Sequence, residues 1–434
     1  MNEPLAVREA PAGYVLETQP VGRASARHVG LKPDLPVIPP GYKCPKGYKQ
    51  TEVGVIPEDW ESIALAHLSA FITKGSTPTT YGFKWEPSGV LFLRSECVSE
   101  DGLDLAQSMF ISPAAHATLR RSEVCDGDIL ITITGNVGRV VRLVGVGDAN
   151  LNQHIARVRI TAPNADSQYV YHYLSQPSIR RRFNSITTGQ AYPQISLKQV
   201  REAGVALPSL PEQRAIAVAL SDVDALLAKL DQLIAKKRDL KQAAMQQLLT
   251  GSTRLPGFGG EWEVKRLGDV VEIRKGQLIT EKDAIAGDVP VIAGGKKPSY
   301  FHNQPNRSGK TITVSASGAS AGYVAFFDTP IFASDCSTIG ESKEYSIEFI
   351  YFQLLLNQNI IYKAQTGGAQ PHIHAVDLRP IEIGVCPVQE QTAIAAVLSD
   401  MDTEIAALEA RRDKTRDLKQ GMMQELLTGR IRLV

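Results

Sequence analysis

One stretch of this 434-residue sequence occurs twice. Shifting residues 212–255 by 178 positions lays them over residues 390–433 without a gap, and 25 of the 44 positions are identical. Internal repeats constrain architecture more than local patterns do, and this period is far too long for a solenoid. The repeat therefore predicts two similar halves that each end in the same helix.

Each copy has the apolar spacing of a long helix. Apolar residues recur in steps of three and four, which is typical of a coiled-coil seam. The seam positions are Leu220, Val223, Leu227, Leu230, Ile234, Leu398, Met401, Ile405 and Leu408. Ser221-Asp222 suits a helix N-cap, so we expect a short helix to about residue 220 and a long one to Leu249. Gly251 and Gly429 stand where a glycine ends a helix.

The seam weakens at Lys237 and Arg412, where apolar packing has to give way to polar contacts. The basic runs Lys236-Lys237-Arg238 and Arg411-Arg412 fit a solvated helix face, with partner docking or phosphate contact as the alternative. A helix of about 28 residues spans about 42 Å, and one turn of B-DNA spans about 34–36 Å. Two such helices packed together can hold two modules about one DNA turn apart. The alternative is that each helix covers the sheets of its own domain.

The repeat divides the chain into five segments. Residues 1–47 form a proline-rich leader that we expect to be extended. Residues 48–210 and 256–388 are two globular modules, and residues 211–255 and 389–434 carry the repeated helix. The module ends match, whereas the middles differ in length and pattern. This is the pattern expected of two variable modules on a common frame.

Within the modules, the patterns favour an α+β fold. Residues 128–134 form a buried-strand pattern, followed by the turn Gly135-Asn136-Val137-Gly138 and a strand at residues 139–144. The turn is too short for a phosphate cradle, so we favour a hairpin. Residues 169–183 and 347–362 have helical spacing.

Composition and missing motifs exclude several classes. No apolar run approaches the roughly 20 residues of a membrane span, and no secretory signal is present, so we expect a cytoplasmic protein without a membrane partner. The five scattered cysteines include no C-x-x-C pair, which argues against disulfides and a cysteine zinc site. His372 and His374 could hold zinc, but a third ligand is not evident. Walker A, amino-methyltransferase and nuclease motifs are absent, so we expect no metal site and no catalysis by the chain itself.

Taken together, these features resemble the specificity subunit of type I restriction-modification enzymes. The resemblance covers residues 48–434 and rests on module ends of the form Gly-x-x-x-Pro-x-Ile, on Glu-Gln helix starts and on Leu-Leu-Thr-Gly helix ends, each present twice. It implies two α/β target-recognition domains that each recognise half of a bipartite asymmetric DNA sequence. Between them, two long helices would pack as an antiparallel coiled coil with pseudo-two-fold symmetry and set the spacer.

The resemblance also implies partners. Two methyltransferase subunits and the restriction subunits would assemble on this non-catalytic chain to form a site-specific deoxyribonuclease and adenine methyltransferase. The chain would bind no cofactor, and S-adenosylmethionine, ATP and Mg²⁺ would belong to the partner subunits. Two alternatives stay open: a protein-binding scaffold of the same family that no longer recognises a defined DNA sequence, and a fused enzyme, against which the missing motifs argue.

Candidate contacts to double-stranded DNA follow from residue type. Arg and Lys pair with guanine, Asn and Gln with adenine, and other polar groups with phosphate. Such residues lie beside loop glycines, which permit close backbone approach. In the first module they are Lys74, Ser76, Thr77, Lys84, Arg94, Asn136, Arg139, Gln190 and Tyr192; in the second they are Lys275, Gln277, Lys296, Lys297, Ser317, Gln370 and His372. Residues 190–192 are the strongest candidates, because the matching Ala369-Gln370 differs where the frame does not.

Overall fold

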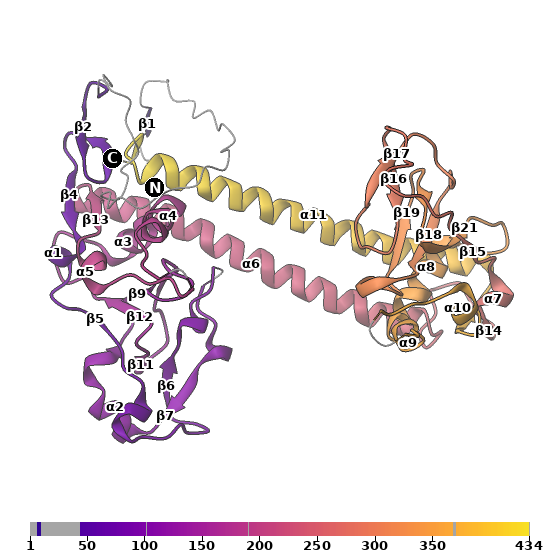
Figure 1. Ribbon diagram of the computed structural model, residues 1–434, viewed down its shortest axis with the longest axis horizontal. Coiled ribbons are helices and arrows are strands. Elements are labelled where there is room, and N and C mark those ends of the chain that lie inside the picture. Colours follow the sequence, from indigo (N-terminus) through magenta and orange to yellow (C-terminus); the bar gives the residue numbers. More distant parts are fainter. Residues whose placement is uncertain (1–6, 10–43, 101, 190, 368–369, 434) are drawn as a thin grey trace. The chain divides into compact units, whose positions relative to one another are not determined.

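The computed structural model (Figure 1) describes residues 7–9, 44–100, 102–189, 191–367 and 370–433. The chain forms two compact units. Unit 1 comprises residues 1–228 with 413–434, and unit 2 comprises residues 229–412. These units do not follow the five sequence segments, because each unit contains one module, the start of one long helix and the end of the other.

The two repeated segments form the long helices α6 (Leu210–Leu248) and α11 (Val388–Leu426), each of 39 residues. The predicted break near residue 220 is wrong. Ser221 does not cap a new helix there, because its hydroxyl binds His172 Nε2 at 2.9 Å and the amide of Gln168. At 1.5 Å per residue each helix is about 58 Å long rather than about 42 Å. Gly251 and Gly429 follow the helix ends with φ of +71°, which confirms their predicted role.

The first sheet of unit 1 has the antiparallel order β10-β9-β12-β5. Its strands are β5 (Ile72–Lys74), β9 (Ile129–Thr132), β10 (Val140–Arg142) and β12 (Ile155–Val158). All four residues of β9 are buried, as expected of an apolar run covered on both faces. The predicted hairpin is confirmed, because β9 and β10 pair around residues 133–139.

The second sheet of unit 1 is mixed, with the order β7-β6-β11-β8. Its strands are β6 (Val90–Leu93), β7 (Met109–Ile111), β8 (Glu123–Val124) and β11 (Ala149–Leu151). Three two-stranded pairs complete the unit: β1 (Val7–Glu9) with β23 (Ile431–Leu433), β2 (Tyr48–Thr51) with β3 (Gly54–Pro57), and β4 (Glu61–Ala64) with β13 (Gly204–Leu207). Apart from residues 7–9 and 44–47, the predicted leader lies outside the described residues.

Short helices fill the rest of unit 1: α1 (Leu65–Leu68), α2 (Pro113–Thr118), α3 (Ser167–Leu174), α4 (Pro177–Ser185) and α5 (Leu197–Arg201), with 3₁₀ turns η1 (Pro78–Tyr81), η2 (Ser95–Cys97), η3 (Leu105–Gln107) and η4 (Arg120–Ser122). The helical spacing of residues 169–183 is confirmed, but it belongs to two helices, α3 and α4. Pro177 opens α4, and Gln176 before it is extended, because a proline disfavours the helical conformation in the preceding residue.

Unit 2 has the four-stranded sheet β15-β21-β18-β19 and the three-stranded sheet β17-β16-β20, with the pair β14–β22. The strands are β14 (Glu263–Arg266), β15 (Arg274–Lys275), β16 (Val289–Ile292), β17 (Tyr300–His302), β18 (Thr311–Ser315), β19 (Val324–Phe327), β20 (Phe332–Ala333), β21 (Cys336–Gly340) and β22 (Glu382–Val385). The helices are α7 (Leu267–Val270), α8 (Ile347–Leu356), α9 (Gln358–Lys363) and α10 (Ala375–Leu378), with the turn η5 (Gly318–Ser320). The helix expected at 347–362 is again divided in two.

Each core uses equivalent residues of the repeat. In unit 1, Ile216 and Leu220 of α6 pack with Met423 and Leu426 of α11. In unit 2, the residues 178 positions away do the same: Ile394 and Leu398 of α11 pack with Met245 and Leu248 of α6. Among the seam positions, Leu220, Leu230, Ile234, Leu398 and Ile405 are buried, and Val223, Leu227, Met401 and Leu408 are partly buried. The long helices are therefore part of both folded cores.

Candidate nucleic-acid interface

The loop after β9 gathers the first set of candidate residues. Ile195 N donates to Ile133 O at 2.9 Å, Thr134 forms a β-bridge with Gln194, and Gly135 N donates to Pro193 O at 2.8 Å. These bonds join residues 133–138 to the loop 188–195. Together with residues 75–77 and 152–154, these segments form what we call loop cluster 1.

The loop 188–195 has a tight backbone. Thr188 and Gln194 exchange two backbone hydrogen bonds of 2.9 Å. Gly189 has φ of +86°, and a Cβ there would lie 2.7 Å from the carbonyl oxygen of Tyr192, so a side chain is excluded. Tyr192 is 58% exposed. Tyr192 is thus exposed to solvent between two residues that are joined by backbone hydrogen bonds, and the predicted contact Gln190 lies outside the described residues.

Gln153 and His154 also belong to loop cluster 1, although they are not among the predicted DNA contacts. Thr77 Oγ1 donates to Gln153 Oε1 at 2.7 Å, Gln153 Nε2 lies 3.0 Å from His154 Nε2, and the His154 ring meets Tyr192 edge-on at 6.2 Å. The signal was the run of amide and imidazole side chains immediately before β12. Three separate loops therefore meet through polar side chains.

Gly75 brings the first candidates into the same cluster. Its N–H donates to Asn152 O at 3.0 Å, and a Cβ at this position would lie 1.6 Å from Leu151 O. Only glycine permits this crossing, which places Ser76 and Thr77 beside residues 152–154. Lys74, at the end of β5, is exposed.

Other candidates of the first module have different surroundings. Arg94 donates to Gln107 O through Nε and Nη2 at 3.2 and 3.1 Å, and Arg139 Nη1 donates to Val98 O at 3.4 Å. Arg139 also lies 3.8 Å from Glu100, whose pKa is held below its usual value chiefly by the hydrogen bond from Arg180. These two guanidiniums are engaged within unit 1. Asn136 is exposed in the hairpin, and exposed Lys84 stands between Phe83 and Trp85 of a separate apolar cluster.

Unit 2 contains an equivalent loop cluster 2, formed by residues 276–277, 294–297, 316–318, 333–336, 366–367 and 370–373. Ile373 N donates to Ala316 O at 2.9 Å, Ser317 forms a β-bridge with His372, and Gly318 N donates to Pro371 O at 3.1 Å. Thr366 and His372 exchange two backbone bonds of 2.8 Å, and Gly367 has φ of +86°. The paired backbone bonds and the glycine of the first loop therefore recur, with exposed Gln370 in the place of Tyr192.

Ser317 lies at the centre of loop cluster 2. Its hydroxyl donates to Asp335 Oδ2, and a Cβ on Gly294 would lie 2.6 Å from its carbonyl oxygen. Gln277 N donates to Ala333 O at 2.9 Å, which brings the Lys275–Gln277 segment to the same place. Asp335 is not among the residues predicted from the sequence, because no neighbouring side chain marks it as a loop contact.

The remaining candidates of unit 2 are cationic or imidazole groups. Lys296 Nζ lies 5.5 Å from the centre of the Tyr323 ring, and Lys275 and Lys297 are exposed. His372 and His374 have stacked rings 6.3 Å apart. Among the residues that the structure describes, no three His, Cys, Asp or Glu side chains are placed to hold a metal ion.

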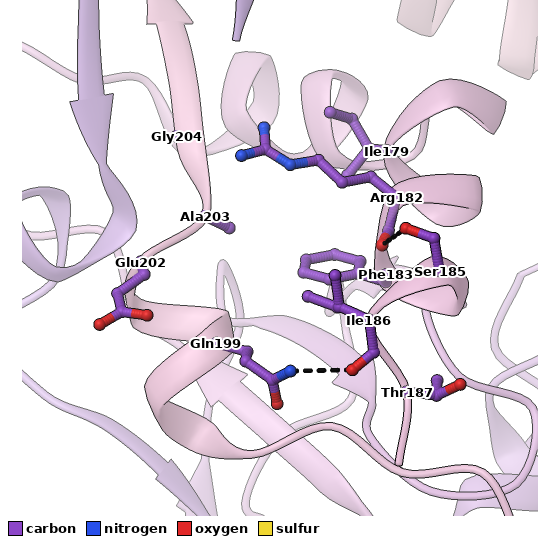
Figure 2. Close-up of a pocket in the computed structure, with 10 residues that line it drawn as sticks. All are labelled: Ile179, Arg182, Phe183, Ser185, Ile186, Thr187, Gln199, Glu202, Ala203 and Gly204. Atoms are coloured by element: carbon purple, nitrogen blue, oxygen red, sulfur yellow. Dashed lines mark hydrogen bonds between the residues drawn. The ribbon is translucent and has the colours of Figure 1, made fainter. Parts of the chain in front are cut away.

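A pocket of about 460 Å³ lies between α4 and α5 of unit 1 (Figure 2). Gln199 Nε2 donates to Ile186 O at 2.9 Å on its wall, and Ser185 Oγ donates to Arg182 O at 2.8 Å. Its lining includes none of the candidate residues from either loop cluster. We assign this pocket no part in the interface.

A buried ion pair closes each unit. In unit 1, Arg432 binds both oxygens of Glu212 at 2.6 and 2.8 Å, and the Glu212 side chain is 2% exposed. In unit 2, Arg254 binds both oxygens of Glu390 at 2.5 and 2.6 Å, and the Glu390 side chain is fully buried. The two pairs differ by 178 positions in both partners. Each pair joins the segment that follows one long helix to the first turn of the other long helix. The dipole of that helix also stabilises a carboxylate at its N-terminus.

The basic runs form ion pairs between the helices. In unit 2, Lys237 lies 2.7 Å from Glu404, Lys241 2.5 Å from Asp402, and Arg412 3.7 Å from Asp231. Arg238 pairs with Glu409. In unit 1, Lys419 lies 2.6 Å from Asp224, and this pair is the repeat equivalent of Lys241 with Asp402. The apolar seam thus gives way to ion pairs at Lys237 and Arg412.

Two modules of the same design, each with one loop cluster and joined to duplicated helices, define a class of two-module recognition proteins. The sequence matches the model of the type I restriction modification DNA specificity domain at residues 57–236 and again at residues 259–415. The chain therefore belongs to the family of type I restriction-modification specificity subunits, which recognise the DNA target. The suspected resemblance is confirmed.

Individual relatives agree with this assignment. The type I restriction enzyme MjaVIII specificity subunit of Methanocaldococcus jannaschii is 23% identical over 414 residues, 87% of this chain and 94% of the relative. The S subunit from M. genitalium has a similar fold, with a TM-score of 0.61 and 17% identity over 85% of this chain and 96% of that one. A second solved structure comes from work on complex assembly and conformational transition of the type I R-M system. It has a TM-score of 0.53 and 16% identity, over 86% of this chain and 99% of that one. Among the described residues, no helix is long and apolar enough to cross a membrane.

Proposed function

We propose that this specificity subunit recognises a bipartite, asymmetric DNA sequence, one half with loop cluster 1 and the other with loop cluster 2. This proposal rests on the equivalence of the two clusters. The same backbone bonds hold Tyr192 and Gln194 in unit 1 but Gln370 and His372 in unit 2. Because the two loop clusters have the same backbone arrangement, we expect them to dock on DNA in the same way. Their different side chains would then prefer different bases. Exposed lysines around the clusters supply phosphate contacts and a steep salt dependence.

The long helices set the spacer in this proposal. The pairs Asp224–Lys419, Asp231–Arg412 and Lys241–Asp402 have the same sum of residue numbers, as one antiparallel register along α6 and α11 requires. We infer a single antiparallel coiled coil with pseudo-two-fold symmetry. Such symmetry suits two identical partner subunits, one on each repeat.

Those partners are two methyltransferase subunits, joined for restriction by translocating nuclease subunits in a cytoplasmic complex. One solved structure with a similar fold concerns complex assembly of the type I R-M system. This similarity supports an assembly role for this chain. The chain itself contributes recognition and no catalysis. S-adenosylmethionine, ATP and Mg²⁺ then act on the partner subunits. A scaffold that no longer recognises defined DNA is the competing function.

A matched deletion tests the spacer and the competing function together. Removing residues 232–238 from α6 and 405–411 from α11 keeps the apolar seam in register and shortens both helices by about 10 Å. In selections from randomised duplexes, we expect unchanged half-sites and a spacer shortened by about three base pairs. Lys236→Ala keeps the length and serves as the control. An unchanged spacer would refute the spacer role, and equal affinity for all sequences would establish the scaffold function.

A further inference from the structure

His154 and Asp335 occupy the same position in the two units, although the sequence repeat does not align them. Ile133 accepts from Ile195 N and donates through its own N–H to His154 O at 2.9 Å. Ala316 accepts from Ile373 N and donates in the same way to Asp335 O at 3.1 Å. The separation is 181 residues rather than 178, because the intervening loops differ in length.

The side chains at this position have opposite hydrogen-bonding character. Thr77 fixes the oxygen of the Gln153 amide, so the amide N–H donates to His154 Nε2 and leaves Nδ1–H as the donor of the ring. The side chain of Asp335 carries two carboxylate oxygens, which act as hydrogen-bond acceptors. Its Oδ2 accepts from Ser317, and Oδ1 retains acceptor capacity.

Both residues stand beside the variable exposed positions. The His154 ring contacts Tyr192, which is 58% exposed, and Asp335 contacts Ser317, the bridge partner of His372. A partly buried polar side chain held from below by another side chain and open to a DNA-facing loop is a suitable base-edge contact, because its geometry is fixed before binding.

We propose that position 154/335 determines specificity in each half-site, a proposal that rests on the DNA recognition proposed above. Asp335 accepts a hydrogen bond from an exocyclic amino group in the major groove, which cytosine presents at N4 and adenine at N6. His154 donates to an acceptor such as guanine N7 or O6. The two half-sites differ at the corresponding base because the protein group differs in character.

The test uses the full-length chain and selection from randomised duplexes, with Asp335→Asn as the main variant. The amide has the shape of the carboxylate but adds a donor and loses the charge. We expect the preference for an amino-bearing base to fall about tenfold or more at one position of a single half-site. His154→Gln should alter one position of the other half-site. Asp328→Asn, an exposed acid in the turn after β19, should change neither.

Ser317→Ala separates base contact from a supporting role. This variant removes the bond that holds Asp335 but keeps the carboxylate, so the amino-base preference should weaken without changing to another base. The proposal is overturned if Ser317→Ala and Asp335→Asn alter the motif in the same way, or if Asp335→Asn leaves every base preference unchanged. A wild-type chain that enriches no bipartite motif would instead overturn the proposed function itself. If Asp335→Asn does not fold, as judged by thermal unfolding, Asp335→His and His154→Gln decide the question.

Discussion

Units 1 and 2 share the contacts that hold the long helices but differ in the sheets that carry the loop clusters. Unit 1 has a four-stranded second sheet, and unit 2 has the three-stranded β17-β16-β20 in that place. The ion pairs Arg432–Glu212 and Arg254–Glu390 and the packing of each arginine 5.7 Å from a tryptophan ring are the same in both. Buried polar contacts tolerate little change, whereas exposed loops tolerate much. The loop clusters and the second sheets therefore differ more between the units than the contacts that hold the long helices do.

The ion pairs themselves differ in one respect. Arg432 binds a second carboxylate, Asp59, at 2.7 and 3.0 Å, and this bond holds the pKa of Asp59 below its usual value. Arg254 binds the carbonyl oxygens of Gly259 and Gly260 in its place. In unit 2 one continuous segment links Leu255 to Trp262, whereas in unit 1 the contact of Arg432 with Trp60 joins residues from the two ends of the chain.

The largest expected effect is on this contact. Arg432→Ala leaves Glu212 buried without its partner and should destabilise unit 1 by about 2–4 kcal/mol, less than a fully buried pair because Arg432 is partly exposed. Arg254→Ala removes one ionic partner rather than two, so unit 2 should lose less. Hydrogen exchange measured by mass spectrometry reports each unit separately.

Asp59→Asn provides the matched control, because Arg432 then has Glu212 as its one carboxylate partner. Arg254 likewise has Glu390 as its one carboxylate partner among the described residues. Its effect should be small, since Asp59 is largely exposed. Equal destabilisation by Arg432→Ala and Asp59→Asn would show that the buried Glu212 contributes nothing.

The long helices and their ends could be predicted from the sequence because they occur twice. Leu220, Leu398, Gly251 and Gly429 follow from a 178-residue offset and helical periodicity. Sequence reasoning missed His154 and Asp335, since loops of unequal length shift their separation to 181 and only backbone hydrogen bonds establish their equivalence. Helix breaks were also misplaced: Ser221 has the residue type of an N-cap, but its hydroxyl serves a contact with α3 that no local pattern encodes.

A second prediction concerns a buried difference between the units. His172 of α3 is 1% exposed, and burial, with Lys419 and Arg142 nearby, lowers its pKa to about 3. Its Nε2 binds Ser221 at 2.9 Å, and Asp224 lies 3.9 Å from Nδ1. The backbone N–H groups of Asp166 and Ser346 bind Gln213 and Gln391, so α8 of unit 2 places Phe352 where α3 places His172.

Acid should therefore destabilise unit 1 more than unit 2. Between pH 6.5 and about 3 the unfolded chain binds a proton on His172 that the folded chain does not. The free energy of unfolding of unit 1 is thus not reduced by His172 above pH 6.5. It falls by about 1.4 kcal/mol for each pH unit below that value. His172→Phe, which copies unit 2, should remove this slope. Hydrogen exchange of α3 against pH measures it, and an unchanged slope in the variant would contradict the assignment.

The smallest effect is expected at the equivalent ion pairs of the helices. Asp224 with Lys419 and Asp402 with Lys241 have acid side chains 35% and 44% exposed, so double-mutant cycles with alanine should give coupling energies of about 0.2–1 kcal/mol. Salt at about 1 M should remove most of each coupling. Lys241→Ala alone should cost more than Lys419→Ala, because Lys241 also lies 5.2 Å from the Phe352 ring. If the two couplings differ by more than this range, the helix register is not equivalent in the two units, and the inferred two-fold symmetry of the spacer fails with it.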